Sequence, residues 1–498
     1  MRLGELCAAL PDAQVPEAAT QLSVRAVQSD SRVVEPGDLF VAVPGTEEDS
    51  RQHARQAVER GAIVVVSETS LEVAVPLVLV SDARLALARL AAAAVGNPAD
   101  QLQLVGITGT LGKTSVLSML AEILRAAGIA TGSIGSLGIE HGASDTATSN
   151  TTPGALELQR ALSEMVAAGT RVLAMEVTSH ALTQGRVHGL TYDVGIFTNL
   201  TMLEHLEYHA SFRAYVDAKR LFLKHLRPSA PLIFPAGDRA VSQMVRAHGG
   251  PLISCGGTPG AVVSVRRHRL GVAGTRISLS VRRALPGPDG RTIPPHAFPL
   301  ELATLGRTNV NNAVLATVAA LCLGAEAAAA QSALASLQPP RRRLQIIRRE
   351  GPCIIDDTVG HPDSITGVFE VAERIPHRRL HVVFCIRGQR GPVINERDAE
   401  ALAIWSRRVP VHRFISTSAV DTADERNTVT AGERDAFLRV ITSAGLPHTH
   451  HDRLEDAIDA ALDGCGHRDL LLLLGAQGMD TGAAIIANAH RSRGAAPA

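Results

Sequence analysis

Residues 107–115 read ITGTLGKTS, a glycine-containing stretch that ends in Lys-Thr-Ser. The run before it, LQLVGI, predicts a buried strand, and the run SVLSMLAEILRAAG after it predicts a helix. The apolar side chains that share one face of this helix are Val116, Leu117, Leu120, Ile123, Leu124 and Ala127, and Gly128 is placed as its C-cap. A strand, a glycine turn and a helix in this order predict a phosphate-binding loop.

The loop supplies several groups that can bind a nucleotide. Its glycines let backbone N–H groups point inward, Lys113 reaches the terminal phosphates, and Thr114 can hold Mg²⁺. The loop positions at which we predict nucleotide contacts are Gly109, Thr110, Gly112, Lys113, Thr114 and Ser115. Ile107 stands where the general pattern has a further glycine, so an ordinary strand-to-helix turn with a surface lysine is the alternative.

The composition limits the class of protein. A chain of 498 residues is too long for one core and predicts about three domains. Hydrophobic residues make up 45% of the chain and aromatic residues only 3%, so Ala, Leu, Val and Ile must form the cores. The 49 Lys and Arg residues balance the 49 Asp and Glu residues, and the basic stripe of a nucleic-acid-binding protein is missing.

Cysteine usage and hydropathy indicate a soluble protein. The six cysteines are scattered without a CxxC pair, which argues against a disulfide framework or a zinc cluster. The N-terminal MRLGELCAALPDAQ lacks the apolar core of a signal peptide, and no run of about 18 apolar residues occurs. We therefore expect a cytoplasmic monomer that acts on small molecules, without a nucleic-acid or membrane partner.

Two boundary signals divide the chain. GNP at residues 96–98 closes an Ala-rich helix, and SLQPPRRRLQ at residues 336–345 is Pro-rich and then basic. We predict domains at residues 1–98, 99–337 and 338–498. Strands alternate with helices in the second and third domains, which predicts an α/β protein whose central sheet is mostly parallel.

Polar residues follow two further predicted strands. Glu176 ends the strand in VLAMEV, and residues 199–219 follow the strand in DVGIFTN. Because the carboxyl ends of parallel strands line one crevice, we expect Glu176 near the phosphate loop, where its carboxylate suits Mg²⁺. Taken singly, Glu176 could equally be a solvated carboxylate and His205 a histidine whose ring is satisfied by ordinary hydrogen bonds.

Five motifs in order resemble one family. They are TGTLGKTS, SNTTPGALELQRAL, MEVTSHALTQGRV, FTNLTMLEHLEYHASFRAYVDAKRLF and LGRTNVNNAVLA, and the N-terminal SDSRVVEPGDLFVAVPGT agrees with them. Together they resemble the Mur ligases, and within that family the branch of UDP-N-acetylmuramoyl-tripeptide synthetases, which adds the third residue of the peptidoglycan peptide. The resemblance is strong over residues 23–345 and weak after them.

The resemblance implies a fold and a reaction. The fold has an N-terminal UDP-binding α/β domain, a central ATP-binding domain and a C-terminal Rossmann-like domain. In the reaction, ATP phosphorylates a substrate carboxylate, and the amine of an amino acid attacks the acyl phosphate to give an amide, ADP and phosphate. Two Mg²⁺ ions and Lys113 would neutralise charge as the γ-phosphoryl group moves.

The resemblance also implies the catalytic, metal and nucleotide residues. Thr114, Glu176 and His205 match Mg²⁺ contacts, and Lys219 matches a lysine that these ligases carry as a carbamate. A carbamate is an anion that binds metal, whereas an ammonium group would repel it. An ordinary helix lysine is the alternative for Lys219. The further nucleotide contacts implied are Asn309, Asp357 and one hinge arginine among Arg341, Arg342 and Arg343, of which we take Arg341.

The acceptor contacts implied for a UDP-muramoyl peptide lie in three motifs. They are Ser31 and Arg32 in DSR, Thr151 and Thr152 in NTTP, and Thr178, Gln184 and Arg186 in TSHALTQGR. Two threonines at a helix start with an arginine nearby suit an anion, although NTTP is also an ordinary N-cap followed by proline. Arg390 matches a contact to the carboxylate of the incoming amino acid.

This sequence departs from the family pattern in the loop and in the C-terminal part. Leu111 replaces the asparagine of GTNGKT, which can lower nucleotide affinity but leaves the backbone cradle. DYAHTPD becomes DTVGHPD, with Gly360 at the usual histidine and His361 one place later. DNPR, which selects meso-diaminopimelate, is absent from STSAVDTADERNT, and GKGHE becomes GAQGMD. We therefore expect an amine other than meso-diaminopimelate, and the sequence leaves open whether it is lysine.

Two alternatives remain beside a ligase of UDP-muramoyl dipeptide. The rewritten C-terminal half also fits a paralogous ligase that joins a different acid and amine in a dedicated pathway. Leu111 and Gly360 also fit a catalytically silent subunit that keeps the fold and supports a partner ligase.

Overall fold

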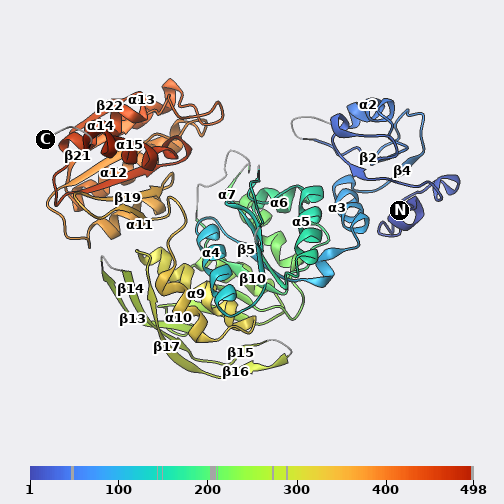
Figure 1. The fold of residues 1–498 in the computed structure, drawn as a ribbon, viewed down its shortest axis with the longest axis horizontal. Coiled ribbons are helices and arrows are strands. Elements are labelled where there is room, and N and C mark those ends of the chain that lie inside the picture. The colour runs from blue at the N-terminus through green and yellow to red at the C-terminus, as the bar shows by residue number, and fades with distance from the viewer. Residues whose placement is uncertain are drawn as a thin grey trace.

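Three separate sheets form the framework of the chain in the computed structural model (Figure 1). The structure describes residues 1–45, 50–142, 144–148, 150–201, 209, 211–271, 274–287 and 290–494. In Figure 1 the N-terminal sheet lies at one end, the central sheet in the middle and the C-terminal sheet at the other end. This is a mixed α/β protein with the three-part architecture that the sequence predicts. The domain boundaries at residues 98 and 337 stay predictions.

The N-terminal sheet has four parallel strands in the order β1-β2-β3-β4. They are β1 (Val27–Gln28), β2 (Leu39–Val41), β3 (Val64–Ser67) and β4 (Leu77–Leu79), accompanied by the helices α1 (Leu3–Cys7), α2 (Ala54–Glu59) and α3 (Ala83–Ala94). The strands β2 and β3 are short apolar runs, with Ser67 at the end of β3, and every residue in them is buried, as expected for a parallel sheet covered on both faces.

The central sheet has eleven strands in the order β17-β14-β13-β12-β11-β10-β5-β9-β6-β7-β8. Its parallel part consists of β5 (Gln103–Thr108), β6 (Thr131–Gly135), β9 (Val172–Glu176), β10 (Val194–Phe197), β11 (Leu232–Pro235) and β12 (Leu252–Gly256). The strand β5 lies between β9 and β10, so the three segments that follow these strands emerge at the same edge of the sheet.

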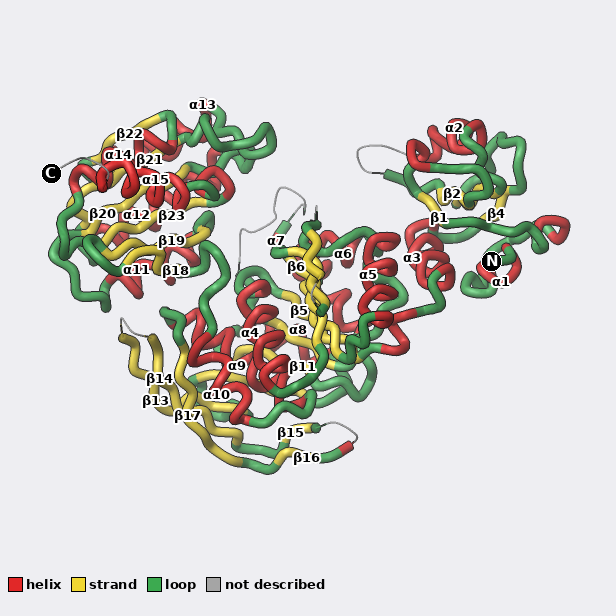
Figure 2. Tube along the Cα trace, viewed as in Figure 1, coloured by secondary structure: helices red, strands yellow, loops and turns green. Residues whose placement is uncertain are grey.

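Helices cover both faces of this sheet, as Figure 2 shows. They are α4 (Lys113–Ala126), α5 (Ala155–Ala167), α6 (Ser179–Thr183), α7 (Phe212–Arg220), α8 (Arg239–Met244), α9 (Arg307–Cys322) and α10 (Ala327–Ser336). Alternate residues of β5 point to opposite faces: Val105 and Ile107 pack in one core with α4 and α9, and Leu104 packs in the other. The two cores hold the phosphate loop at the carboxyl end of β5.

Both ends of the central sheet are antiparallel, which the alternation of strands and helices did not predict. The strands β13 (Val263–Gly271), β14 (Gly274–Val281) and β17 (His296–Leu302) form one end, and β7 (Gly138–His141) and β8 (Ser144–Thr146) form the other. A small ribbon of β15 (Leu285–Pro286) and β16 (Thr292–Ile293) lies beside β17 in Figure 1. In β14, Ile277, Leu279 and Val281 are buried while Arg276 is exposed, which is the period-two pattern of a half-buried strand.

The C-terminal sheet has the order β18-β19-β23-β20-β21-β22. Its strands are β18 (Gln345–Arg348), β19 (Cys353–Thr358), β20 (Leu380–Cys385), β21 (Val411–Thr417), β22 (His448–His451) and β23 (Leu470–Gly475), of which only β18 is antiparallel. Its helices are α11 (Pro362–Ala372), α12 (Pro392–Arg408), α13 (Ala431–Ser443), α14 (Leu454–Gly464) and α15 (Gly482–Gly494). The parallel strands with helices between them confirm the Rossmann-like third part.

A buried charge network marks the entry to the C-terminal sheet. Arg342, which is 6% exposed, donates to Asp356 (3.1 Å), to Asp480 and to the carbonyl oxygen of Gly475. Asp357 next to it accepts a hydrogen bond from the Leu344 N–H (2.8 Å). Burial raises the pKa of Asp357 from 3.8 to about 7, against the lowering effect of that hydrogen bond. Asp357 is therefore poised to carry a proton near neutral pH.

Replacing Asp357 by asparagine should remove a pH dependence of stability. Because the folded-state pKa lies above 3.8, the associated stability is complete below that pH and is lost as the pH rises through about 7. Relative to the wild type, the free energy of unfolding of Asp357→Asn should therefore increase with pH, by up to about 1.4 kcal/mol per pH unit in this interval. Urea titrations followed by the fluorescence of Trp405, the single tryptophan, measure the C-terminal unit directly.

The exposed Asp435 on α13 provides the matched control. Its side chain is 64% exposed and pairs with Arg434, so Asp435→Asn makes the same chemical change at the surface of the C-terminal unit. An Asp357→Asn profile that differs from the wild type by a constant amount would contradict the raised pKa.

Candidate active site

A cavity of about 870 Å³ lies between the carboxyl edge of the central sheet and the C-terminal unit. Its central wall is the phosphate loop with residues that follow β9, β10, β11 and β12, together with the start of α9. Its C-terminal wall is the first half of α11 with Arg343, Leu344 and the end of β19. The sequence-predicted residues that line it are Thr110, Gly112, Lys113, Thr114, Ser115, Thr151, Glu176, Thr178, Asn309 and Asp357.

The phosphate loop needs glycine at two positions. Gly109 has φ +137°, and a Cβ there would overlap the Thr198 Oγ1. Gly112 has φ +84°, and a Cβ there would lie 2.7 Å from the Asn312 Oδ1. Both positions are therefore closed to L side chains, which explains the glycine spacing of the loop. Lys113 begins α4 and its Nζ donates to the carbonyl oxygens of Gly109 (3.1 Å) and Thr110 (2.9 Å), so the ammonium group lies over the loop.

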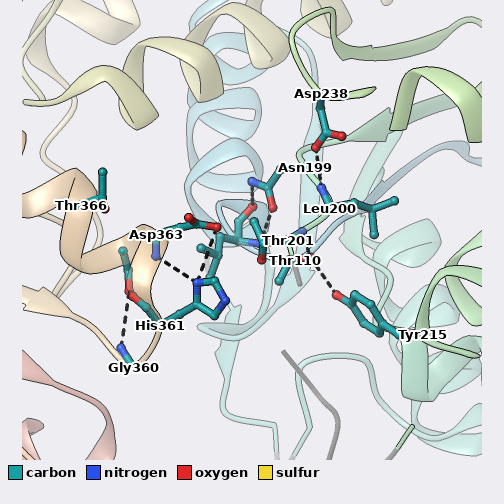
Figure 3. Close-up of polar contacts among 12 residues, drawn as sticks. Thr110, Asn199, Leu200, Thr201, Tyr215, Asp238, Gly360, His361, Asp363 and Thr366 are labelled. Atoms are coloured by element: carbon teal, nitrogen blue, oxygen red, sulfur yellow. Dashed lines mark hydrogen bonds and ion pairs between the residues drawn. The ribbon is translucent and has the colours of Figure 1, made fainter. Parts of the chain in front are cut away.

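The segment that follows β10 supports the loop from behind. Asn199 Nδ2 donates to the Leu111 carbonyl oxygen (2.9 Å), and the Leu111 N–H donates to the Asn199 Oδ1 (2.9 Å). Thr198 Oγ1 donates to the same carbonyl oxygen (2.6 Å). Thr110 Oγ1 lies 2.9 Å from the Tyr215 hydroxyl and accepts from the Thr201 N–H (3.1 Å), as Figure 3 shows. Leu111 thus leaves the backbone cradle intact, because its peptide is held by other residues.

A cluster of hydroxyl groups connects Glu176 to the predicted acceptor residues. The Glu176 Oε1 accepts from the Ser136 N–H (2.9 Å), and Ser136 Oγ lies 3.0 Å from Thr151 Oγ1. Thr152 Oγ1 donates to the Glu176 carbonyl oxygen (2.9 Å) and lies 3.3 Å from the Thr178 Oγ1. The phosphate loop and the predicted acceptor contacts therefore share one edge of the sheet.

Gln184 and Arg186 belong to the same cluster although they do not line the cavity. Arg186 Nη1 donates to the Thr152 carbonyl oxygen (2.9 Å), and Arg186 Nε donates to the Gln184 Oε1 (2.9 Å). The two residues come from the turn after α6 and are brought to the NTTP segment by these hydrogen bonds.

The side chains at this edge fit Mg²⁺ coordination. Glu176 is 1% exposed and lines the cavity together with Thr114, so a residue with a carboxylate and a residue with a hydroxyl group border the same space. Among the described residues, no three His, Cys, Asp or Glu side chains converge as a metal site. Mg²⁺ needs no such cage, since it usually binds one or two carboxylates together with substrate phosphates and water. His205 lies outside the described residues.

Lys219 is buried on α7 near the phosphate loop. Its side chain is 1% exposed, and its Nζ lies 5.0 Å from the centre of the Tyr215 ring. Tyr215 is hydrogen-bonded to Thr110, so α7 is connected to the loop. Lys219 does not line the cavity as described. A buried lysine in this place is compatible with the carbamate interpretation, which stays a prediction.

The start of α11 faces the loop from the C-terminal unit, where Figure 3 shows His361 and Asp363 across from Thr110. His361 is the N-cap of this helix: its Nδ1 accepts from the Asp363 N–H (3.1 Å), and Pro362 occupies the first turn. The Gly360 carbonyl oxygen accepts from Arg387 Nη1 (2.8 Å). The shifted histidine of DTVGHPD therefore has a structural role as a helix cap.

Of the three hinge arginines, Arg343 lines the cavity and Arg341 does not. Arg341 is exposed, and Arg342 is buried in the network with Asp356 and Asp480. The lining of the cavity favours Arg343 over Arg341 for the predicted nucleotide contact, and the backbone between them is left-handed at Arg342 (φ +55°). Asn309 lines the cavity from α9, where its Nδ2 donates to the Leu305 carbonyl oxygen (2.8 Å).

Three predicted substrate contacts lie away from the cavity. Ser31 and Arg32 are in the N-terminal unit, where Ser31 Oγ donates to the Gln56 Oε1 (2.8 Å) and Arg32 pairs with Asp30 (2.8 Å). Arg390 follows β20, and its N–H donates to the Glu433 Oε1 (2.7 Å). The cavity brings together the nucleotide residues and part of the acceptor residues, but not these three.

Some residues of the site were not predicted from the sequence. They include Thr198, Asn199, Thr201, Asp238, Asn312, Arg307 and Glu370, all of which line the cavity. The signal for the first three was present, because they directly follow a predicted strand at the same sheet edge as Glu176. Arg307 and Glu370 form a 2.6 Å ion pair between α9 and α11, which only the arrangement of the two units reveals.

The state of the cysteines and the character of the helices in the described part of the chain agree with the sequence analysis. All six cysteines are free. No described helix combines the length and the apolar character that a bilayer crossing requires.

The fold resembles solved structures of one family over nearly its whole length. A UDP-N-acetylmuramoyl-L-alanyl-D-glutamate–2,6-diaminopimelate ligase superposes with a TM-score of 0.69 at 22% identity, covering 98% of this chain and 99% of that chain. A MurF ligase from Thermotoga maritima in complex with ADP superposes with a TM-score of 0.66 at 17% identity, covering 95% and 99%. At these identities the likeness concerns the fold.

Sequence comparisons give the family. The model of the Mur ligase middle domain matches residues 107–320, and that of the Mur ligase, glutamate ligase domain matches residues 342–477. A UDP-N-acetylmuramoyl-L-alanyl-D-glutamate–2,6-diaminopimelate ligase from Geobacillus thermodenitrificans is 34% identical over 485 residues, 95% of this chain and 94% of its own length. A Listeria monocytogenes ligase of the same name is 31% identical over 488 residues, covering 95% and 93%. The chain belongs to the Mur ligase family, whose members are ATP-dependent ligases.

Proposed function

We propose that this Mur ligase activates the carboxylate of a UDP-muramoyl dipeptide as an acyl phosphate and joins it to an amine. One observation carries the proposal: Lys113 and Thr114 of the phosphate loop line the same cavity as Glu176, Thr151 and Thr178. A nucleotide on the loop would thus have its γ-phosphate directed toward an acid held by the threonines. The names of the relatives, which state a muramoyl-dipeptide substrate for those proteins, support the same acid.

The reaction follows from the poor electrophilicity of a carboxylate. A carboxylate oxygen attacks the γ-phosphorus of ATP, and the bond from that phosphorus to the ADP oxygen breaks. The amine nitrogen then attacks the acyl carbon, and the tetrahedral intermediate loses phosphate and a proton to give the amide. Lys113 would carry the positive charge that offsets the charge on the transferring phosphoryl group. The helix start at residues 112–115 supplies N–H groups for the phosphates.

Mg²⁺ would be held by Thr114 and Glu176, with His205 and carbamylated Lys219 as the further ligands that the resemblance implies. The bound ion supplies Lewis-acid charge neutralisation at the phosphates. The Ser136 N–H donates to the Glu176 Oε1 and so orients the carboxylate, as hydrogen bonds to metal-binding carboxylates usually do.

The acid would be bound by the hydroxyl cluster and the N-terminal unit. Thr152, Thr178, Gln184 and Arg186 form one hydrogen-bonded group beside Glu176, and an arginine within it suits an anionic substrate group. Ser31 and Arg32 would contact the UDP end of the substrate.

For the amine we propose a compound other than meso-diaminopimelate. In place of DNPR, the segment after β21 contains Ala419, which is fully buried in a left-handed turn, and Asp421, which accepts hydrogen bonds from the first N–H groups of α14. Ala419 and Asp421 serve the fold, and the one arginine of this segment, Arg426, is exposed and does not line the cavity. The same observation favours the paralogous ligase as a second candidate.

Product analysis with ATP, the UDP-muramoyl dipeptide and a panel of amino acids tests the proposal. We expect one amide product by mass spectrometry, and one labelled oxygen in the released phosphate when the acid carries ¹⁸O in its carboxylate. Lys113→Ala should lower kcat by about a hundredfold or more, because a charge that stabilises the transition state is lost. Lys224→Ala, an exposed lysine on the same unit, should have no effect.

The failures of this experiment are distinguishable. Phosphate release with another acid, but not with the muramoyl dipeptide, would favour the paralogous ligase. Phosphate without label would contradict the acyl phosphate. Absence of nucleotide turnover with every acid and amine would favour the silent subunit.

The carbamate on Lys219 has its own test. After equilibration with ¹³C-bicarbonate, the wild type should give a carbamate carbon resonance in the NMR spectrum that Lys219→Ala lacks. We expect the same variant to lose most of its activity, since an anionic metal ligand is removed. A wild-type spectrum without the resonance, in fully active enzyme, would contradict this role.

A further inference from the structure

The residues that follow β10 make an unusually complete set of hydrogen bonds to the phosphate loop. The Thr110 N–H donates to the Asn199 carbonyl oxygen (3.0 Å), and the Leu111 N–H donates to the Asn199 Oδ1 (2.9 Å). Asn199 Nδ2 and Thr198 Oγ1 both donate to the Leu111 carbonyl oxygen (2.9 and 2.6 Å). Asn199 therefore holds both ends of the Leu111 backbone with one side-chain amide.

The Leu111 side chain cannot supply hydrogen bonds to its own backbone. Leucine has no hydrogen-bonding group, so the polar groups of its partly buried backbone need partners from elsewhere. A carboxamide is a neutral group whose oxygen can accept from an N–H while its nitrogen donates to a carbonyl. Asn199 lies where both atoms reach Leu111, and the close approach of Thr198 to Gly109 fixes the distance between the two segments.

These bonds also decide which N–H groups are left for phosphate. The N–H groups of Thr110 and Leu111 are both taken up by Asn199, through its carbonyl oxygen and its Oδ1. The start of α4, from Gly112 to Ser115, adds the N–H groups of a helix N-terminus, which have no acceptor in the preceding turn of the helix. A nucleotide can use them only while the Leu111 peptide keeps this orientation, because rotation of that peptide would move Gly112 and the helix start.

We propose that Asn199 is a positioning residue for nucleotide binding: its carboxamide locks the Leu111 peptide and thereby directs the N–H groups of residues 112–115 to the phosphates. This role goes beyond the proposed ligase reaction, and it rests only on nucleotide binding at the loop. Asn199 acts through the backbone of the loop, so it sets nucleotide affinity without taking part in the transfer itself.

Asn199→Ala tests the role through direct binding of ADP, measured by isothermal titration calorimetry. Without the carboxamide, the loop samples orientations that cannot bind phosphate. The apparent affinity then falls in proportion to the fraction of molecules whose loop is in the binding orientation. For the loss of two hydrogen bonds we expect the Kd of ADP to increase about tenfold. The KM values for the acid and the amine should stay within about twofold of the wild type.

Asn199→Asp gives a readout that a general loss of stability would not produce. An ionised carboxylate would place a negative oxygen opposite the Leu111 carbonyl, whereas a protonated carboxyl group could donate to it as the amide does. Because an aspartate of ordinary pKa, about 3.9, is ionised between about pH 5 and 8, Asn199→Asp should bind ADP more weakly than Asn199→Ala throughout this range. The charged groups nearby, Lys113 and Asp238, are the same in all variants, and Asn199→Ala should keep a constant ratio to the wild type.

The exposed Asn97 between α3 and β5 provides the matched control, because Asn97→Asp makes the same chemical change away from the loop. It should bind ADP like the wild type at every pH. Thermal melting of each variant shows that it is folded, and Asn199→Asp alone decides the question if Asn199→Ala does not fold.

Two outcomes would overturn the inference: Kd values of both Asn199 variants within twofold of the wild type, or an affinity of Asn199→Asp that follows the wild type at every pH. Because the readout is ADP binding, it is independent of turnover. A wild type that binds ADP but makes no amide would contradict the proposed function and leave this inference standing, whereas a wild type that binds no ADP would contradict both.

Discussion

The turn between β5 and α4 must keep its backbone N–H groups directed into the cavity, and the surrounding structure is organised by that requirement. Glycine is the only residue type that fits at positions 109 and 112, because Thr198 approaches the backbone at the first and Asn312 at the second. The neighbouring strands β9 and β10 deliver Glu176 and Asn199 to the two sides of the loop. A parallel sheet with β5 between them is what brings these groups to one edge.

The second wall of the site depends on how the C-terminal unit meets α9. Gly306 precedes α9, and a Cβ there would lie 2.9 Å from the Leu344 side chain and 3.0 Å from that of Val371. The ion pair between Arg307 and Glu370 joins the same two helices at the cavity. Close packing and one charged contact therefore hold the arrangement in which α11 faces the phosphate loop. A charged contact of this kind is weak when solvated, so the packing at Gly306 is the more specific constraint.

The sequence predicted the parts of this structure that depend on local pattern. The loop, the helix from Lys113 and the parallel strands were recognisable because glycine spacing and hydrophobic periodicity act within a few residues. The antiparallel strands β13, β14 and β17 were missed, since nothing local says which neighbour a strand pairs with. The preference for Arg343 over Arg341 depends on a left-handed turn at Arg342, and the clamp by Asn199 depends on two segments that are distant in the sequence.

The same reasoning explains why the nucleotide end of the site can be inferred in more detail than the amine end. Phosphate recognition uses backbone N–H groups, whose directions are fixed by glycines and a helix start. Amine recognition would use side chains on the loops after β20, β21 and β23, and three carboxylates there or packed against them already have structural partners. Asp421 caps α14, Asp480 pairs with Arg342, and Glu433 accepts from the N–H groups of residues 389–391. These three carboxylates are engaged within the fold, and the DNPR motif is absent from the sequence, so the amine has to be identified from the product.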